Sequence, residues 1–264
     1  MSGAHSKHEF ALYVPNLTGL LSHISVAQVL VFDDAEIVHR MQSVLRLEPG
    51  EEIRLFDHRL QALCIIQSVH KKEVRCLVSE RKETIPLMPP VTFFLPLLKK
   101  EDLEAALYSL VELGANAIQL VVTEKSRQPG PKDREQKELE RLERVMIAAA
   151  EQSKQFVIPI LSPVRSFEAL LENLAQKKPG SVSLFFDPEG DDLFTVMNDL
   201  RVQSPAEIFL LVGPEGDLTE EEKGALVKTG IRFCKLTPTV LRALQAVAVG
   251  MGMVRSVVSP AKVH

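Results

Sequence analysis

The sequence predicts an α/β protein in which a parallel sheet covered by helices forms the larger C-terminal part and a small β-barrel precedes it. After residue 90, near-continuous apolar segments alternate with segments of helical periodicity, which is typical of parallel strands buried on both faces. Before residue 82, the apolar segments are short, rich in β-branched residues and separated by turn residues. The 264 residues suffice for two cores, and we expect domains at 1–82 and 90–264.

Three strands are expected in the first domain: "EIRLF" at Glu52–Phe56, "LQALCIIQSV" at 60–69 and "EVRCLVS" at 73–79. The breakers Pro49-Gly50 and Asp57-His58-Arg59 lie beside them. The segment 81–90, "RKETIPLMPP", contains three prolines, and proline favours extended chain over a helix or a central strand. We therefore place the domain boundary in this segment.

The second domain begins with the apolar strand "VTFFLPLL", which a helical pattern follows. Apolar residues at positions 103, 106, 107, 110 and 111 share one helical face, and Gly114 is placed to cap the C-terminus of that helix. The strand "AIQLVVT", a charged amphipathic helix at about 133–153, the strand "FVIPIL" and a helix from about Ser166 come next. This alternation predicts the parallel sheet.

Two later apolar strands run into similar turns, "SLFFDPEGDD" and "FLLVGPEGDLTEEE". Ligands of open parallel sheets lie outside the carboxyl ends of the strands, so the two turns suggest one site. In the second turn, Gly213 and Gly216 allow close approach of backbone to a ligand or a positive φ. Thr219 and Glu222 form a capping box that opens a helix ending at Gly230. The Gly213–Gly216 turn alone is equally consistent with a plain strand-to-helix connection, and the turn at 187–190 alone favours such a connection.

Composition and charge exclude several classes of function. The chain is 45% hydrophobic and 25% charged, as in ordinary globular proteins. It has neither of the common glycine-rich phosphate motifs, and Glu215 and Glu222 would repel an anion from the helix start, so the ligand is expected to be neutral or cationic, with an adenine or similar ring. The net charge of −4 gives no global attraction to nucleic acid, although a local basic patch stays compatible with it.

The three cysteines, Cys64, Cys76 and Cys234, are far apart and have no metal-ligand spacing, so we expect reduced core residues and no metal site. The N-terminus lacks the pattern of a signal peptide, and no apolar segment approaches the ~20 residues of a membrane span. These features predict a soluble, cytoplasmic protein with no membrane partner.

The third element follows the strand "RFCKL": the segment "TPTVLRALQAVAVGMGMVRSV" turns into an apolar helix and carries Arg242 near its start. The order of an [HD]-P-E turn, then G-P-E-G, then L-x-P-x-[IV]-L-R resembles the RsmE family of SPOUT-superfamily RNA methyltransferases. Further stretches agree with this family, namely "HRMQSVLRLEPGEEIRLFD", "LVELGANAIQLVVTEKS" and "RLERVMIAAAEQS". The resemblance covers nearly the whole chain.

The resemblance implies a SPOUT-type trefoil-knot domain, a PUA-like N-terminal barrel for RNA binding, and a homodimer. It implies S-adenosyl-L-methionine as cofactor and N3 of a uridine in 16S (small-subunit) ribosomal RNA as target. The cofactor would be held by three loops, at 186–189, 212–216 and 236–242. The expected contacts are Phe186, Asp187, Pro188, Glu189, Val212, Gly213, Pro214, Gly216, Leu236, Thr237 and Leu241.

The reaction adds a methyl group to a ring nitrogen that must lose its proton, so negative charge develops on the uracil. We expect Arg242 to stabilise that charge. We expect Glu215 to orient Arg242 or the base, or instead to fix its loop by accepting backbone hydrogen bonds. Phosphate contacts are expected from Arg40, Arg46, Lys125 and Arg127, for which solvated surface charge is the alternative.

The second domain departs from the family pattern at three places, and the first domain has Phe56-Asp57-His58 where the family has an F-D-G turn. Asp217 replaces a usual second glycine, and Asp tolerates left-handed backbone better than most residues. Thr239 stands where the family has an arginine, and Ala243-Leu244-Gln245 replaces a polar T-E-T. Two other hypotheses therefore stay open: a methyltransferase with another target, such as a ribose 2'-oxygen, and a catalytically weak RNA-binding assembly protein.

Overall fold

The computed structural model describes residues 10–130 and 132–258, and the side chains from residue 136 onward in the second of these ranges. They form two compact units, one from residues 10–85 and 150–157, the other from residues 86–149 and 158–258. The sequence predicted 90–264 as one continuous domain, whereas the structure places 150–157 in the first unit. Among the described helices, none combines the length and the apolar character that crossing a bilayer requires.

The first unit is built on a five-stranded sheet in the order β1-β3-β4-β5-β2. β1 (Phe10–Tyr13) pairs parallel to β3 (Glu52–Phe56), whereas β4 (Leu60–His70), β5 (Glu73–Glu83) and β2 (Val29–Phe32) add antiparallel strands. The three predicted strands are confirmed, two of them longer than expected. The short helices α1 (Leu17–Leu20) and α2 (Ala35–His39) and a π-helix at Arg40–Val44 complete residues 10–85.

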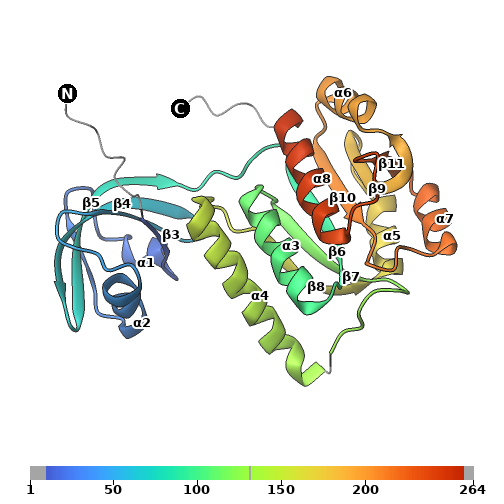
Figure 1. Cartoon of the computed structure of the whole chain (residues 1–264). Coiled ribbons are helices and arrows are strands. Elements are labelled where there is room, and N and C mark those ends of the chain that lie inside the picture. The colour runs from blue at the N-terminus through green and yellow to red at the C-terminus, as the bar shows by residue number, and fades with distance from the viewer. Residues whose placement is uncertain (1–9, 131, 259–264) are drawn as a thin grey trace. The chain divides into compact units, whose positions relative to one another are not determined.

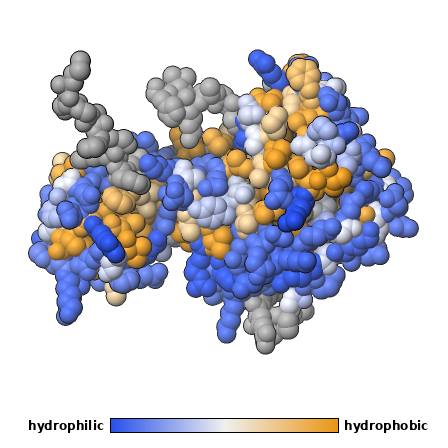
Figure 2. Space-filling view, viewed as in Figure 1, coloured by the Kyte–Doolittle hydropathy of each residue, from blue (hydrophilic) through white to orange (hydrophobic). Residues whose placement is uncertain are grey.

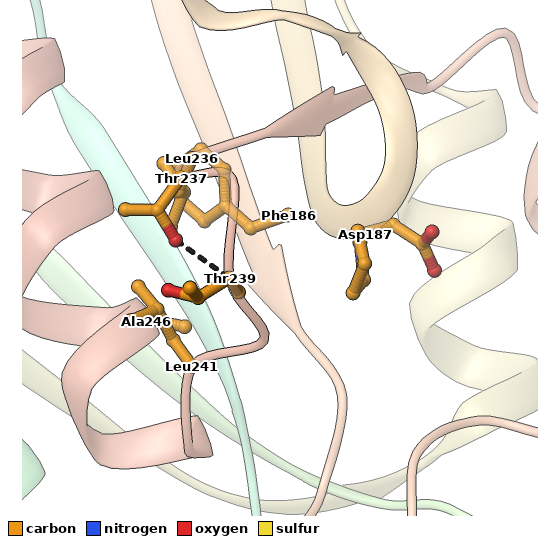
Figure 3. Close-up of a pocket in the computed structure, with 8 residues that line it drawn as sticks. Phe186, Asp187, Leu236, Thr237, Thr239, Leu241 and Ala246 are labelled. Carbon is orange, nitrogen blue, oxygen red and sulfur yellow. Dashed lines mark hydrogen bonds between the residues drawn. The ribbon is translucent and has the colours of Figure 1, made fainter.

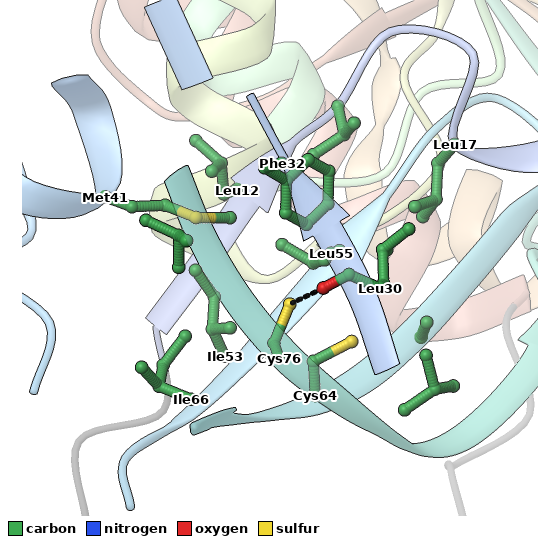
Figure 4. Packing of buried hydrophobic residues seen from close by; sticks show 14 of the residues in the cluster. Leu12, Leu17, Leu30, Phe32, Met41, Ile53, Leu55, Cys64, Ile66 and Cys76 are labelled. Atoms are coloured by element: carbon green, nitrogen blue, oxygen red, sulfur yellow. Dashed lines mark hydrogen bonds between the residues drawn. The ribbon is translucent and has the colours of Figure 1, made fainter. Parts of the chain in front are cut away.

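The core of this unit is apolar and includes two of the three cysteines (Figure 4). Leu12, Ile53 and Leu55 are fully buried in it, as are Cys64 and Cys76. All three cysteines of the chain are free and buried, which confirms the prediction that they are core residues.

Residues 150–157 close the first unit through one carboxylate and one aromatic ring. Glu151 accepts a hydrogen bond from the Tyr13 amide at 2.8 Å and forms an ion pair with Arg40 at 2.7 Å. The Phe156 ring packs edge-on against Phe56, with ring centroids 5.2 Å apart.

The second unit contains a six-stranded sheet, all parallel as predicted, in the order β11-β9-β10-β6-β7-β8. Its strands are β6 (Val91–Pro96), β7 (Ala117–Val122), β8 (Ile160–Ser166), β9 (Ser181–Asp192), β10 (Glu207–Val212) and β11 (Arg232–Lys235). Its helices are α3 (Lys100–Glu112), α4 (Lys132–Ser153), α5 (Phe167–Ala175), α6 (Leu193–Gln203), α7 (Glu220–Lys228) and α8 (Ala243–Val258). The last residues of α4, from 150 to 153, belong to the first unit.

Helices cover both faces of this sheet. α8 packs against α3, α6 and β10 on one face, where Figure 1 shows α3 and α8 side by side. α5 and α7 cover the other, where Phe167, Leu170 and Leu226 join the core with alternate residues of the strands. Successive strand residues face opposite sides of the sheet. Because helices cover both faces, the residues on each face are apolar, which explains the near-continuous apolar strands in the sequence.

Local signals determine the ends of several helices. Ser166 caps α5, Thr219 and Glu222 form the predicted capping box of α7, and Gly114 and Gly230 take φ of 79° and 73° just past their helices. The strand predicted at "FVIPIL" is displaced: β8 begins at Ile160, because residues 150–157 belong to the first unit.

The turn predicted at Asp187-Pro188-Glu189-Gly190 is a bulge inside a longer strand. β9 continues to Asp192, and β11 pairs with it on both sides of the irregularity: Phe233 lies opposite Phe185, and Cys234 opposite Asp191. Gly190 is required by close approach, since a Cβ there would lie less than 3.0 Å from the backbone of residues 233–234.

Candidate functional site

The strand order brings three loops to one edge of the sheet. β9 lies between β11 and β10, so the bulge within β9 and the segments that leave the carboxyl ends of β10 and β11 are neighbours. They are the first loop (186–189), the second loop (212–217, one residue longer than the sequence predicted) and the third loop (236–242). Together with the start of α8 they line a cavity of about 430 Å³, called here the loop cavity. Its lining residues are Lys99, Asp102, Phe186, Pro188, Val212, Gly213, Pro214, Glu215, Asp217, Val240, Leu241, Arg242, Ala243, Leu244, Gln245 and Ala246.

A smaller cavity of about 40 Å³ adjoins the first and shares Phe186, Pro188, Leu241 and Ala246 with it. Leu236, Thr237 and Thr239 supply its third-loop wall (Figure 3). The Thr237 hydroxyl donates to the Thr239 carbonyl at 2.6 Å, which tightens this loop. The lining of the smaller cavity is therefore mainly apolar, with Asp187 and two threonines as its polar residues, whereas several charged side chains line the loop cavity.

The third loop presents backbone donors without protein partners. Within the described chain, the amide N–H groups of Thr237, Thr239, Val240 and Leu241 form no hydrogen bond with another protein group. A backbone N–H strongly favours having a partner, so these donors suit a ligand or water at the cavity wall.

The second loop turns at Asp217 and not at its glycines. Asp217 has φ of 59° and its amide donates to the Pro214 carbonyl at 2.9 Å, whereas Gly213 and Gly216 do not have positive φ. This confirms that Asp at this position tolerates left-handed backbone. Gly213 is needed for space, because a Cβ there would lie 2.8 Å from the Asp217 carboxylate.

A lysine joins the first two loops. Lys223 of α7 lies 2.8 Å from Oδ2 of Asp187 and 2.8 Å from Oδ2 of Asp217. Burial lowers the pKa of the Lys223 ammonium, but hydrogen bonds and attraction from the two carboxylates outweigh burial and raise that pKa above its ordinary value. Lys223 is therefore charged at neutral pH.

Arg242 and Glu215, the two residues predicted to act on the substrate, both line the loop cavity but differ in their hydrogen-bond partners. Arg242 is exposed, and its guanidinium has no partner among the described residues. Glu215 accepts a hydrogen bond from the Lys99 amide at 3.0 Å, at the start of α3. The second loop is thereby tied to α3, which is one of the alternatives predicted for Glu215.

Comparisons with known proteins agree with this arrangement. Residues 86–255 match the family model described as an RNA methyltransferase domain. The chain is 31% identical to the ribosomal RNA small subunit methyltransferase E of Mycobacterium bovis, over 86% of both chains. The chain belongs to the ribosomal RNA small subunit methyltransferase E family. The Bacillus subtilis member is 29% identical and aligns over 78% of this chain and 82% of its own.

The fold of the family matches as well. The Neisseria gonorrhoeae member, solved bound to S-adenosyl methionine, superposes with a TM-score of 0.78 at 25% identity, over 96% of this chain and 99% of that one. The structure here is thus a mixed α/β fold similar to that of a family member along nearly its whole length.

Not all family-derived cofactor residues line a cavity. Glu189 and Gly216 line neither of the two: the Glu189 amide donates to Asp187 at 2.8 Å, and Gly216 lies against the Lys125 side chain. In Figure 3, the Asp187 carboxylate points away from the other labelled residues.

Sequence reasoning missed Lys99 and Asp102, which follow β6 and line the loop cavity. The rule that ligands lie at carboxyl ends of parallel strands could have identified them. It also missed Lys223, for which no local signal exists.

The predicted RNA contacts divide between the units. In the first unit, Arg40 is engaged with Glu151, whereas Arg46 is exposed at φ of 54°. In the second, Arg127 pairs with Glu138 at 2.6 Å, and Lys125 is exposed. Among the residues that the structure describes, no cluster of three or more His, Cys, Asp and Glu side chains could hold a metal ion.

Proposed function

We propose that this chain is an S-adenosylmethionine-dependent methyltransferase that methylates N3 of a uridine in small-subunit ribosomal RNA. The observation that carries the proposal is the convergence of the three family loops on one cavity. Membership of the family supports the substrate class, and the Neisseria gonorrhoeae member bound to S-adenosyl methionine supports the cofactor.

The residues at the three loops fit this cofactor. A cavity of about 430 Å³ is within the range of small-ligand sites, roughly 300–1,000 Å³. Phe186, Leu236 and Leu241 offer apolar contact to a ring, and the third-loop amides that lack partners in the described part of the chain offer hydrogen bonds to its acceptors. When bound, the cofactor supplies a methyl group on a positively charged sulfur. The cavity wall carries charges of both signs, with the carboxylates of Asp102 and Glu215 available to that sulfur and the cations of Lys99 and Arg242 beside them.

The chain's own residues would position the base and stabilise charge. Arg242 stands at the junction of the third loop and α8, and its guanidinium has no partner among the described residues, so it can donate to a uracil oxygen that gains negative charge as N3 loses its proton. Glu215 holds the second loop against α3 through the Lys99 amide and keeps the cavity wall in place. Lys125 and Arg46 are exposed cations suited to phosphate contacts.

We further propose a homodimer formed through α8, in the cytoplasm. Apolar side chains are exposed on and beside this helix, with Met253 37% and Val240 79% accessible, and Figure 2 shows apolar surface in this region. The PUA-like class of the first unit and the trefoil knot of the second belong to the same proposal. After edge strand β11 the chain returns across the sheet, and α8 packs against β10 and α3. This path is compatible with a knot, in which the chain passes through one of its own loops.

The test is methyl transfer to small ribosomal subunits from a strain that lacks its own enzyme of this kind, with mapping of the product by mass spectrometry. We expect a methyl group on uridine N3. Arg242→Ala should lower kcat by about 10²-fold while cofactor binding persists, because charge stabilisation acts mainly in the transition state. Lys228→Ala, an exposed cation on α7, is the control and should transfer at the wild-type rate.

One second candidate has an observation in its favour. Ala243, Leu244 and Gln245, which replace polar family residues, line the loop cavity. A changed wall there favours another target, such as a ribose 2'-oxygen. Methylation mapped to a ribose would select this candidate, and cofactor binding with no transfer to any ribosomal RNA would contradict both.

A further inference from the structure

Asp187, Asp217 and Lys223 form a three-residue ion cluster that joins separate cofactor loops. Each carboxylate uses its two oxygens for different purposes. Oδ1 of Asp187 accepts from the Glu189 amide at 2.8 Å, and Oδ1 of Asp217 accepts from the Leu218 amide at 2.7 Å. Oδ2 of each contacts Lys223 at 2.8 Å. One oxygen of each residue therefore shapes its own segment, and the other fixes that segment to α7.

Burial makes the cluster obligatory for the first loop. The Asp187 side chain is only 2% exposed, and a carboxylate removed from water is strongly unfavourable without a charged partner. Lys223, 17% exposed, provides that charge. Asp217 is 52% exposed, so its share of the attraction is partly screened by solvent. Asp187 anchors the cluster, and Asp217 extends it to the second loop.

The cluster lies immediately behind the cavity wall. Asp187 stands between Phe186 and Pro188, both of which line the loop cavity, and Asp217 lines it directly. A small displacement of either loop would therefore move cavity-lining groups. Proximity effects in ligand sites are sensitive to displacements of this size.

We propose that Asp187, Asp217 and Lys223 act together as positioning residues, a charge clip that sets the spacing of the first and second loops and thereby the affinity for S-adenosylmethionine. The cofactor part of the proposal rests on the proposed function above. The coupling between the loops does not, because it is a property of the protein without cofactor.

The experiment compares Asp217→Asn and Lys223→Met with wild type. Asn retains the left-handed backbone and the Oδ1 acceptor but removes the charge, so it isolates the ionic link. The matched controls are Glu221→Gln and Lys228→Met, an exposed acid and an exposed cation of the same helix. Hydrogen exchange of the free protein is measured over residues 186–190, and the dissociation constant of S-adenosylmethionine is measured by calorimetry at low and high salt.

In the free protein, Asp217→Asn should accelerate exchange at the Glu189 amide, although the substitution lies in the other loop. The dissociation constant should rise about fivefold for Asp217→Asn and about a hundredfold for Lys223→Met. Wild-type affinity should fall with added salt more than that of Asp217→Asn. Both control variants should match wild type in all measurements.

Unchanged exchange over 186–190 in Asp217→Asn would overturn the clip, whatever the cofactor result. Faster exchange with unaltered cofactor affinity would overturn its role in positioning the site. Failure of the wild-type protein to bind S-adenosylmethionine would instead contradict the proposed function, and the exchange measurement would still decide whether the two loops are coupled.

Discussion

The ring of Phe186 lies where the first loop, both cavities and α8 meet. It lines the loop cavity and the smaller cavity, and it is only 6% exposed. The position opposite it in α8 is Gly250, where an added Cβ would lie less than 3.0 Å from the ring. Because Gly250 lies within a regular helix, its role is space for an aromatic side chain and not backbone freedom.

Gly250→Ala should therefore push the Phe186 ring toward the cavities. Overpacking typically costs about 1–3 kcal/mol, which offsets the ~1 kcal/mol that alanine gains over glycine in a helix. We expect S-adenosylmethionine affinity to fall about tenfold in calorimetry, with little gain in thermal stability. Gly224→Ala in α7 is the control, because its Cβ would meet nothing within 4 Å. That variant should be more stable and bind normally; equal affinity in both variants would contradict the role of Gly250.

Single elements differ in how far their own sequence determines them. The ends of α5 and α7 follow from Ser166 and from the Thr219–Glu222 capping box, so local reasoning predicts them. The bulge in β9 depends on β11, which follows about 40 residues later and approaches Gly190 too closely for any Cβ. The Asp187 segment therefore looks like a turn in the sequence, although its strand continues.

The β3–β4 turn in the first unit depends on one carboxylate. Asp57 accepts hydrogen bonds from the amides of Arg59 and Leu60, both at 2.8 Å, and from the amide and hydroxyl of Thr18 at 2.6 and 3.0 Å. Burial tends to raise the pKa of Asp57, but these hydrogen bonds together outweigh it and lower that pKa below the ordinary 3.8.

Asp57→Asn should lower the free energy of unfolding of the first unit by about 2 kcal/mol at neutral pH, because charged acceptors form the stronger hydrogen bonds. Since the folded-state pKa is depressed, this stabilisation is complete above the unfolded-state value of 3.8 and is lost as pH falls through the lower folded-state pKa. Denaturation followed by circular dichroism should show the difference between wild type and variant shrinking below about pH 4. The control is Asp33→Asn at an exposed position, which should match wild type. If the difference in unfolding free energy between wild type and Asp57→Asn persisted in acid, the stabilisation would not come from the ionised carboxylate of Asp57.

At the scale of the whole molecule, the sequence predicted the features that depend on periodicity and local spacing. It did not predict the contacts that depend on the order of the strands in the sheet. Alternation of apolar and helical segments gave the parallel sheet, and the family motifs indicated the three loops. The neighbouring positions of β11, β9 and β10, which turn these loops into one site, depend on long-range pairing. The contacts of Lys223 and the packing of residues 150–157 in the first unit arise in the same way.

Arg255 is the long-range contact that closes the second unit. It is 7% exposed, near the end of α8, and donates to the Gly114 carbonyl at 2.8 and 3.0 Å, to the Pro89 carbonyl at 2.7 Å and to the Asn116 side chain. Burial lowers the pKa of Arg255 to about 10, so the guanidinium is still charged at neutral pH. Its position just past the C-terminus of α3 places the cation at the negative end of a helix dipole.

Arg255→Met should preserve apolar packing but remove the guanidinium donor from the carbonyl of the buried Gly114 and from that of the half-buried Pro89. We expect the second unit to lose about 3 kcal/mol of unfolding free energy, since each unsatisfied buried acceptor costs about 1–3 kcal/mol. Arg255→Lys should lose less, because a lysine keeps the charge but cannot span both carbonyls with a planar fork. The exposed Arg201→Met of α6 should stay within about 0.5 kcal/mol of wild type. Denaturation and hydrogen exchange of α8 could instead be the same in Arg255→Met as in wild type. The hydrogen bonds of the guanidinium would then not stabilise the second unit, and α8 would be held to α3 by apolar packing alone.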